Sequence, residues 1–281
     1  MTVQRKIKSR IRSFAPTVID RLQIALGKQD KTYGGEFSAL SEILDSLDIT
    51  EAINFVDIGA RDGFNMSIAF PMSKSFATRG LLIEPNVKQL EFARQIYKDK
   101  DFSFCSEFLN PSNVSDVLKS FGFFEPTYIK IDIDSFDLDL LRGILLNKIL
   151  PKVFSIEINE LLPPPFRFEV KYTGEIVPCT SPLFGCSLQS VVDLATQMNY
   201  SLVSLAFNNA FFVHNNLMRG NLESYNSNPR LLYESGFLNR NWKQLFPGNI
   251  EYEHWLQAST TQLDGLVKTH AGFDATRMMV Y

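Results

Sequence analysis

The stretch from Asn54 to Ser67 constrains the fold of this chain most. Apolar residues dominate positions 53–58, as is typical of a parallel strand covered on both faces. Gly59 and Gly63 follow at the spacing Asp57-x-Gly-x-x-x-Gly, where a strand turns into a helix and glycine lets the backbone approach a ligand closely. The pattern predicts a buried strand, a tight glycine turn and the start of a helix.

The glycine spacing also separates two kinds of nucleotide site. A dinucleotide fold carries Gly-x-Gly-x-x-Gly, in which a third glycine helps to seat a pyrophosphate on a helix N-terminus. This turn is one residue looser and has an acid at its start, which suits a ligand that carries an amine. An ordinary glycine-containing turn without a ligand is the alternative interpretation.

Two further acids follow predicted strands. Glu84 ends the apolar segment at 81–83, a strand-plus-helix length after the first turn, where α/β nucleotide sites place an acid on ribose hydroxyls. Pro85 stops that strand, and Asn86 can cap the next helix. Glu107 follows the strand near 102–106, where it could contact an adenine amino group. Three acids at three successive strand ends predict a ligand crevice along one edge of the sheet.

Composition favours a water-soluble globular protein. The chain has 281 residues, of which 45% are hydrophobic, and this is enough for a large core. A net charge of −3 argues against a nucleic-acid surface, and no apolar segment approaches the ~20 residues of a membrane span. Three cysteines without a Cys-x-x-Cys pair indicate neither a disulfide framework nor a zinc site, so we expect a reducing cytoplasm. The oligomeric state is left open.

Three segments are predicted along the chain. An N-terminal helical segment covers 1–50, an alternating α/β domain covers 51–215, and a helical extension covers 216–281. The tri-proline tract at Pro163 opens an excursion over 160–186, which is either a substrate lid or a stiff surface loop. The predicted strands are 53–58, 80–84, 102–106, 128–133, 153–158, 200–206 and 210–213, and the predicted helices lie near 65–76, 87–99, 113–121, 136–147 and 187–198.

This alternation predicts an α/β fold with a doubly wound, mostly parallel sheet. Its last two strands are joined by the pair Asn208-Asn209, which reads as a tight hairpin turn. The sheet should therefore end in an antiparallel hairpin.

The N-terminal segment carries a helical stripe from Ile7 to Leu22 behind a basic start. A weak membrane-surface contact is one interpretation of that stripe. A helix packed on the domain is the favoured one, because Pro16 interrupts the stripe. No compact apolar run follows the basic residues, so a cleaved signal peptide is not expected.

Three blocks resemble a known family. They are Val56-Asp57-Ile58-Gly59-Ala60, Ile83-Glu84-Pro85-Asn86, and Lys130-Ile131-Asp132-Ile133-Asp134-Ser135-Phe136-Asp137. Over residues 35–215 the chain resembles class I S-adenosylmethionine-dependent methyltransferases, most closely the FkbM type or a neighbouring branch. In that family the last block usually reads Lys-Ile-Asp-Val-Glu-Gly-x-Glu, so its acids are here kept in type but shortened.

The resemblance implies a Rossmann-like class I methyltransferase fold that ends in an antiparallel hairpin. It also implies S-adenosylmethionine as cofactor and methyl transfer, which we expect to go to a hydroxyl oxygen of a small-molecule or sugar-type acceptor. The expected cofactor-binding residues are Asp57, Gly59, Ala60, Gly63, Glu84, Glu107 and Asp132.

The expected chemistry lies at the ends of the fourth and fifth strands. Asp132 and Asp134 alternate on one strand end, and Glu157 and Asn159 repeat that arrangement on the next. Their oxygens are the ligands that Mg²⁺ or Ca²⁺ prefers, so these four residues are a candidate metal site. Direct hydrogen bonding to the cofactor is the alternative. The candidate catalytic residues are Asp134, Glu157 and His214, the last as a base that follows the final strand.

Two other classes of protein remain open at this stage. An NAD-dependent oxidoreductase would also place Glu84 on a ribose, but this chain lacks the third glycine and a Tyr-x-x-x-Lys pair. A binding or assembly protein that keeps the fold without catalysis is the other alternative.

Overall fold

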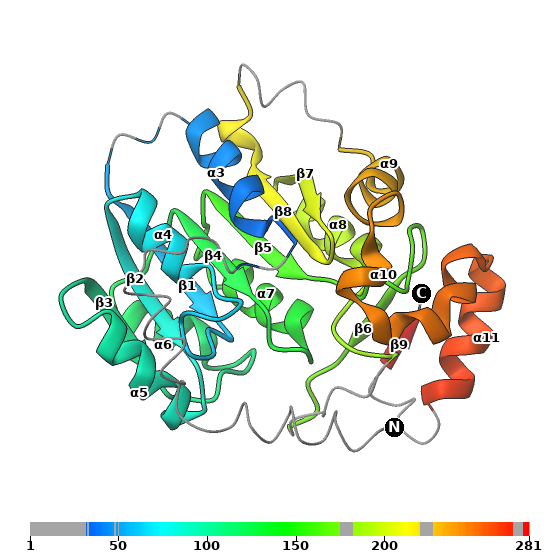
Figure 1. Ribbon diagram of the computed structural model, residues 1–281, viewed down its shortest axis with the longest axis horizontal. Coiled ribbons are helices and arrows are strands. Elements are labelled where there is room, and N and C mark those ends of the chain that lie inside the picture. Colours follow the sequence, from blue (N-terminus) through cyan, green and yellow to red (C-terminus); the bar gives the residue numbers. More distant parts are fainter. Residues whose placement is uncertain are drawn as a thin grey trace.

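A seven-stranded sheet forms the centre of the molecule (Figure 1). The computed structural model describes Thr32, 34–47, Ile49, 51–174, 182–219, 227–271 and 278–280. The strand order is β3-β2-β1-β4-β5-β8-β7; the first five strands run parallel, and β8 runs antiparallel to both of its neighbours. The strands are β1 (Ile53–Ile58), β2 (Thr78–Ile83), β3 (Asp101–Cys105), β4 (Tyr128–Ile131), β5 (Val153–Glu157), β7 (Tyr200–Ala206) and β8 (Asn209–His214). The predicted α/β fold class, including its terminal antiparallel hairpin, is confirmed.

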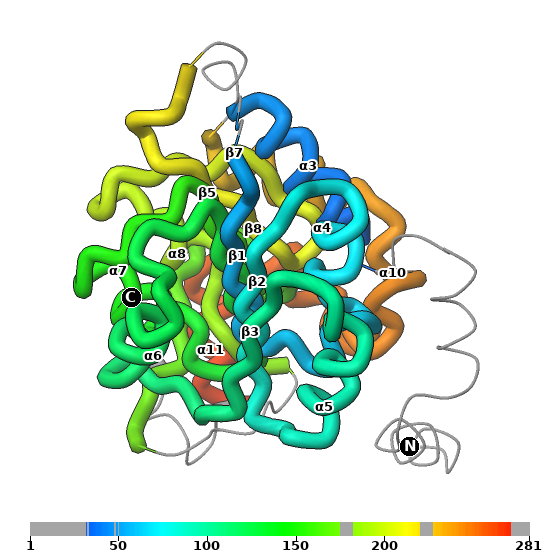
Figure 2. The backbone as a smooth tube through the Cα atoms, turned by 90° about the vertical axis from the view of Figure 1, so that its left-hand side faces the viewer, coloured from blue at the N-terminus to red at the C-terminus, as the bar shows by residue number. Residues whose placement is uncertain are grey.

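Helices cover both faces of the sheet, as Figure 2 shows from the side. One face carries α3 (Glu36–Ser46), α4 (Ala69–Ser75) and α5 (Val87–Ile96). The other carries α6 (Val114–Ser120), α7 (Asp137–Leu146) and α8 (Leu188–Gln197). Because β1, β2, β4 and β5 are covered on both sides, their apolar residues contribute to two separate cores, which explains the near-continuous apolar segments of the sequence. The edge strand β3 is only partly buried.

Two helices begin where their capping residues predict. The Asn86 side chain accepts hydrogen bonds from the Lys88 and Gln89 amides, and Ser187 accepts one from the amide of Ser190. These bonds satisfy amides that a helix start leaves without an intrahelical partner.

Two turns differ from the sequence prediction. Strand β4 ends at Ile131, two residues early, because Asp134 adopts a left-handed backbone conformation (φ 56°) that no strand accommodates. The hairpin turn is Phe207-Asn208 and not Asn208-Asn209, since Asn209 already belongs to β8 and pairs with both Glu157 and Ala206.

The excursion after β5 contains a strand that the sequence did not reveal. β6 (Phe168–Val170) pairs antiparallel with β9 (Met278–Val280), which lies more than a hundred residues later. The side chains of Phe166, Phe168 and Leu183 are buried in the core. The described legs of the excursion therefore pack as interior structure; positions 175–181, at the centre of the predicted lid, and the stripe from Ile7 to Leu22 lie outside the described residues.

The C-terminal extension packs against the hairpin end of the sheet. It comprises α9 (Pro229–Tyr233), η3 (Glu234–Leu238), α10 (Trp242–Leu245), η4 (Pro247–Gln257) and α11 (Thr260–Ala271), after the short η1 (Asn215–Leu217). The Phe207 amide donates to the Gly236 carbonyl (3.1 Å), and the indole of Trp255 is buried. Among the described helices, none has the length and apolar character needed to cross a membrane.

Replacing Gly236 should test this packing. A Cβ atom there would lie 2.3 Å from the Leu205 carbonyl oxygen, so Gly236→Ala should lower the free energy of unfolding by about 1–3 kcal/mol, as overpacking does. Gly265→Ala is the matched control, because a Cβ on that α11 glycine meets nothing within 4 Å and should stabilise the helix by about 0.5–1 kcal/mol. Urea unfolding measures both, and equal stability of the Gly236 variant and the parent would contradict the packing.

Candidate functional site

A cavity of about 510 Å³ opens at the carboxyl ends of the parallel strands. This is the edge at which open α/β sheets bind ligands, and the volume falls within the ~300–1,000 Å³ of small-molecule sites. It is lined by residues at or just after the ends of five adjacent strands: Ile58, Gly59, Arg61, Met66, Ile83, Glu84, Pro85, Glu107, Phe108, Leu109, Asp132, Ile133, Asp134, Ser135, Phe136 and Glu157.

The turn after β1 holds the acid that follows β2. Glu84 accepts hydrogen bonds from two backbone amides, that of Arg61 at Oε2 (3.1 Å) and that of Asn86 at Oε1 (2.8 Å). Gly59 lies beside them with φ 85°, and a Cβ atom there would lie 1.8 Å from the carbonyl oxygen of Asp132. Only glycine fits this close approach of two strand ends. The Glu84 carboxylate is thus fixed at the cavity wall with oxygen lone pairs still available.

Three of the predicted cofactor residues lie behind this wall. Asp57 is buried and accepts a hydrogen bond from the Ser67 hydroxyl (2.9 Å), and burial raises its pKa. A Cβ atom on Gly63 would meet the Leu82 side chain at 2.8 Å, so this glycine serves packing beneath the turn. Asp57, Gly63 and Ala60 do not line the cavity. The other four predicted cofactor residues do line it: Gly59, Glu84, Glu107 and Asp132.

The turn after β4 is fixed by a buried acid. Asp137 accepts hydrogen bonds from the backbone amides of Ile133 (2.8 Å) and Ser135 (2.9 Å). Burial raises the pKa of Asp137 to about 7. These two bonds close the loop around Asp134 and hold its left-handed backbone, so Asp137 shapes the site without lining it.

Three carboxylates converge on the cavity from β4 and β5. Asp132, Asp134 and Glu157 each offer one oxygen, and these three oxygens lie within 4.8 Å of one another. The Asn208 amide donates to Glu157 Oε1 (2.6 Å), while Glu157 Oε2 is buried without a hydrogen-bond partner. Burial, reinforced by Asp132 and Asp134, raises the pKa of Glu157 well above its ordinary value; burial and Asp132 also raise the pKa of Asp134.

A buried lysine lies beneath this group. Lys130 Nζ is 3.2 Å from Asp132 Oδ2 and 3.1 Å from a carboxylate oxygen of Glu36, the first residue of α3. Burial raises the pKa of Glu36 to about 7, although the charge of Lys130 opposes that shift. The lysine thus joins the segment before β1 to the acid at the end of β4.

Two predicted site residues are elsewhere. The Asn159 amide donates to the carbonyls of Pro182 (2.8 Å) and Phe184 (3.2 Å), and its Oδ1 accepts a hydrogen bond from the Leu161 amide (3.1 Å), so this side chain ties the legs of the excursion together. His214 pairs with Tyr200 at the far end of the antiparallel hairpin, at the opposite edge of the sheet. The structure therefore does not bring Asn159 or His214 to the cavity in which the sequence predicts them, because the Asn159 side chain is bonded to the excursion and β8 runs away from the site.

The sequence analysis missed the apolar part of the site and Asn208. Phe108, Phe136 and Met66 line the cavity, and they resemble any other core residues in the sequence. The sequence predicts Asn208 only as a turn residue. The antiparallel pairing of β8 with β5 brings its side chain beside Glu157.

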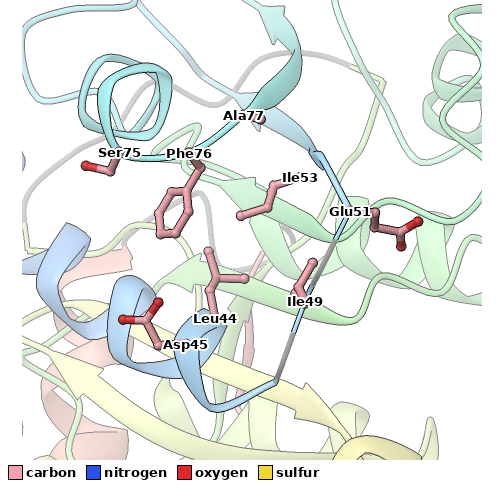
Figure 3. A pocket seen from close by; sticks show the side chains of 8 residues that line it. All are labelled: Leu44, Asp45, Ile49, Glu51, Ile53, Ser75, Phe76 and Ala77. Carbon is pink, nitrogen blue, oxygen red and sulfur yellow. The ribbon is translucent and has the colours of Figure 1, made fainter.

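A second cavity of about 320 Å³ lies at the opposite edge of the sheet (Figure 3). The side chains of Phe76, Ile53 and Leu44 point into it, while the carboxylates of Asp45 and Glu51 point away. It has no convergent polar groups, so it is not a candidate site.

Comparison with known proteins finds only distant structural similarity. No protein-family model matches the chain, and no curated protein does. Among solved structures it is similar to monomeric WbdD, with 12% identity over 66% of this chain and 42% of that one (TM-score 0.44). It is also similar to a methyltransferase from Geobacter sulfurreducens, with 15% identity over 76% of this chain and 97% of that one (TM-score 0.42). A third match is a TehB-like SAM-dependent methyltransferase from Corynebacterium glutamicum, with 12% identity over 69% and 93% (TM-score 0.39).

This chain spans less than half of the WbdD chains that it matches. The seven-stranded Rossmann-like sheet with one antiparallel end is the class of fold that the sequence predicts.

Glu160, a buried acid next to the site, can be used to test whether burial keeps such a carboxyl group protonated. It is 2% exposed, the Asn249 amide donates to its Oε1, Oε2 has no partner, and burial raises its pKa to about 7. An unfolded chain releases this proton near pH 4.5, so the folded state alone retains it between pH 4.5 and 7. The free energy of unfolding is therefore highest, as far as this group is concerned, below pH 4.5. It falls as the pH rises through 7, because the folded state must then bury a charged carboxylate.

Glu160→Gln stays neutral at every pH. Relative to the parent it should gain about 2–3 kcal/mol of unfolding free energy between pH 5 and pH 8, measured by urea unfolding at both values. Glu91→Gln, at an exposed site on α5, is the control and should follow the parent. Parallel pH dependences of the Glu160 variant and the parent would refute a buried, protonated Glu160.

Proposed function

We propose that this protein is an S-adenosylmethionine-dependent methyltransferase that methylates a hydroxyl oxygen of a small-molecule acceptor. The observation that carries the proposal is the linear order of carboxylates along one sheet edge: Glu107 after β3, Glu84 after β2, Asp132 and Asp134 after β4, and Glu157 at the end of β5. Adjacent strands lie ~4.8 Å apart, so the acids follow an elongated cavity from end to end.

The fit to this cofactor rests on Glu84 and Gly59. Glu84 is fixed by two amides and keeps free lone pairs, as a ligand of ribose hydroxyls requires. Gly59 keeps the wall between Glu84 and Asp132 free of side chain, and Glu107 lies within reach of a base over β3. When bound, S-adenosylmethionine supplies a sulfonium methyl group that is electrophilic enough for in-line displacement.

The acids at the β4–β5 end supply the remaining chemistry. Methyl transfer to a hydroxyl releases one proton, and Asp134 or Glu157 can accept it. Burial raises their pKa values, which makes them stronger bases than solvated carboxylates. Phe108 and Phe136 line the same cavity and reduce its access to water.

A divalent cation is the second part of the proposal. The three carboxylate oxygens of Asp132, Asp134 and Glu157 lie within 4.8 Å of one another, and carboxylates suit Mg²⁺ or Ca²⁺. A bound cation would make a coordinated hydroxyl more acidic. Chelator sensitivity with recovery on Mg²⁺ addition would distinguish this version from a carboxylate base.

Removing Glu84 should weaken cofactor binding. We expect Glu84→Ala to lose about 1–3 kcal/mol of S-adenosylmethionine affinity in calorimetry, the range for hydrogen bonds to a charged group. Glu91→Ala on the exposed face of α5 is the control. Parental affinity in the Glu84 variant would exclude it as the ribose ligand, and tight binding of NAD by the parent would favour an oxidoreductase.

Neutralising Asp134 should affect turnover more than binding. Asp134→Asn keeps the size of the side chain and removes its charge, so turnover with an identified acceptor should fall ~10²-fold. Cofactor affinity should change little, since Asp134 is not a proposed ribose or adenine ligand. Asp116→Asn, an exposed acid on α6, serves as control. Near-parental turnover of D134N would move the proton acceptor to Glu157.

A further inference from the structure

Arg61 is the one cationic side chain among the described residues that line the cavity. It follows β1, and its backbone amide donates to Glu84 Oε2 (3.1 Å). Within the part of the chain that the structure describes, its guanidinium forms no ion pair, and its hydrogen bond to the Met66 sulfur (3.9 Å) uses a weak acceptor. The N–H donors of the guanidinium are therefore available to a ligand.

The backbone holds Arg61 in an unusual conformation. Six described residues other than glycine have a left-handed φ, and three of them line this cavity: Arg61 (53°), Met66 (58°) and Asp134 (56°). The Asp62 carboxylate fixes the loop between Arg61 and Met66, because it accepts hydrogen bonds from two backbone amides of that loop (3.0 and 2.7 Å). Left-handed residues with a side chain persist only where their surroundings enforce them, and they concentrate at ligand sites. The loop therefore directs the Arg61 side chain before a ligand binds.

Arg61 and Asp134 lie on the open side of the cavity. Both residues are exposed, whereas the strand ends that form the wall, Ile58 and Ile83, are buried. Burial and the neighbouring Asp132 raise the pKa of Asp134, and the positive charge of Arg61 opposes that rise, so the guanidinium is near this carboxyl group. A cofactor that lies along the buried wall leaves the open side, with Arg61 and Asp134, to the acceptor.

Arg61 is also the one described lining residue that can pair with an anion. The other ionisable lining side chains are carboxyl groups, which carry no positive charge in either protonation state. Lys130 lies beneath the wall and is already paired with Glu36 and Asp132, at 3.1 and 3.2 Å. An acidic group on a ligand therefore has a single favourable position in this cavity, and that position fixes the orientation of the ligand.

We propose that the acceptor carries an acid group, a carboxylate or a phosphate monoester, which Arg61 binds while the hydroxyl to be methylated faces Asp134. This inference rests on the proposed function. The parallel N–H donors of a guanidinium match two oxygens of either acid group, which adds geometric selectivity to the charge. Arg61 is then a specificity residue that orients the acceptor and takes no part in proton transfer.

The test compares probes that differ only in the acid group. D-glucuronate and D-glucose 6-phosphate are each compared with D-glucose, and L-lactate is compared with (S)-1,2-propanediol. Each probe is added to the parent saturated with S-adenosylhomocysteine, and saturation-transfer NMR measures its binding. We expect at least one of the acids to bind ~10-fold or more tightly than its neutral counterpart, as hydrogen bonds to a charged group allow.

Variants of Arg61 assign this preference to its side chain. Arg61→Gln removes the charge and should abolish the preference for acids, while S-adenosylhomocysteine still binds. Arg61→Lys keeps the charge without the paired donors, so it should retain only part of the preference. Arg94→Gln, at an exposed arginine on α5 outside the cavity, is the matched control and should keep all of it. Binding of S-adenosylhomocysteine by each variant also verifies its fold.

The methionine carboxylate of the cofactor has the same chemistry, so a second comparison separates the two sources. Decarboxylated S-adenosylmethionine lacks only this carboxylate. Calorimetry measures its affinity and that of S-adenosylmethionine in the parent and in Arg61→Gln. We expect the ratio of the two affinities to be the same in both proteins, because Arg61 binds the acceptor.

The outcomes separate the inference from the function on which it rests. Equal binding of acids and neutral counterparts, or no binding of any acid, would overturn the acidic acceptor, as would a preference that survives in Arg61→Gln. If the variant loses a parental preference for S-adenosylmethionine over its decarboxylated form, Arg61 binds the cofactor and the inference is overturned too. Failure of the parent to bind S-adenosylhomocysteine or S-adenosylmethionine would instead overturn the proposed function.

Discussion

The close approach of two strand ends, at Gly59 and Asp132, underlies the site. With no side chain on Gly59, the backbone after β1 lies directly against the Asp132 carbonyl after β4. The Asp132 amide donates to the carbonyl of Ile58 (3.0 Å), so the two strands remain in register up to this point. Glu84 and Asp134 then flank a wall made of backbone, which allows one elongated ligand to span five strands.

A polar column on one face of the sheet supports that arrangement. Asp57, Lys130 and Asp132 share the face that carries α3, and Glu36 closes the column from the first turn of that helix. Burying these charges opposes folding, because each group loses its hydration. One lysine shared by two acids reduces that penalty and also fixes Asp132 at the cavity. The segment before β1 is therefore part of the site's foundation.

The sequence predicted much of the scaffold because local patterns determine it. The apolar strand segments, the Asn86 cap and the acids after β2, β3 and β4 all depend on residues near one another in the chain. It did not foresee where Asn159 and His214 lie, because their positions depend on contacts with distant segments. Asp57 lies in β1 and Gly63 in the turn that follows it, but the sequence pattern does not distinguish a residue that lines a cavity from one that packs behind it.

The sequence by itself determined the α/β alternation, the glycine turn and the carboxylates at successive strand ends, because strand period and turn chemistry are local properties. The tertiary structure alone decided that β8, and not β7, pairs with β5, which sets Asn208 and Asn209 beside Glu157 and places His214 at the far edge. It also paired β6 with β9 across more than a hundred residues. Pairing over such separations depends on how the two cores pack, and no short sequence window contains that information.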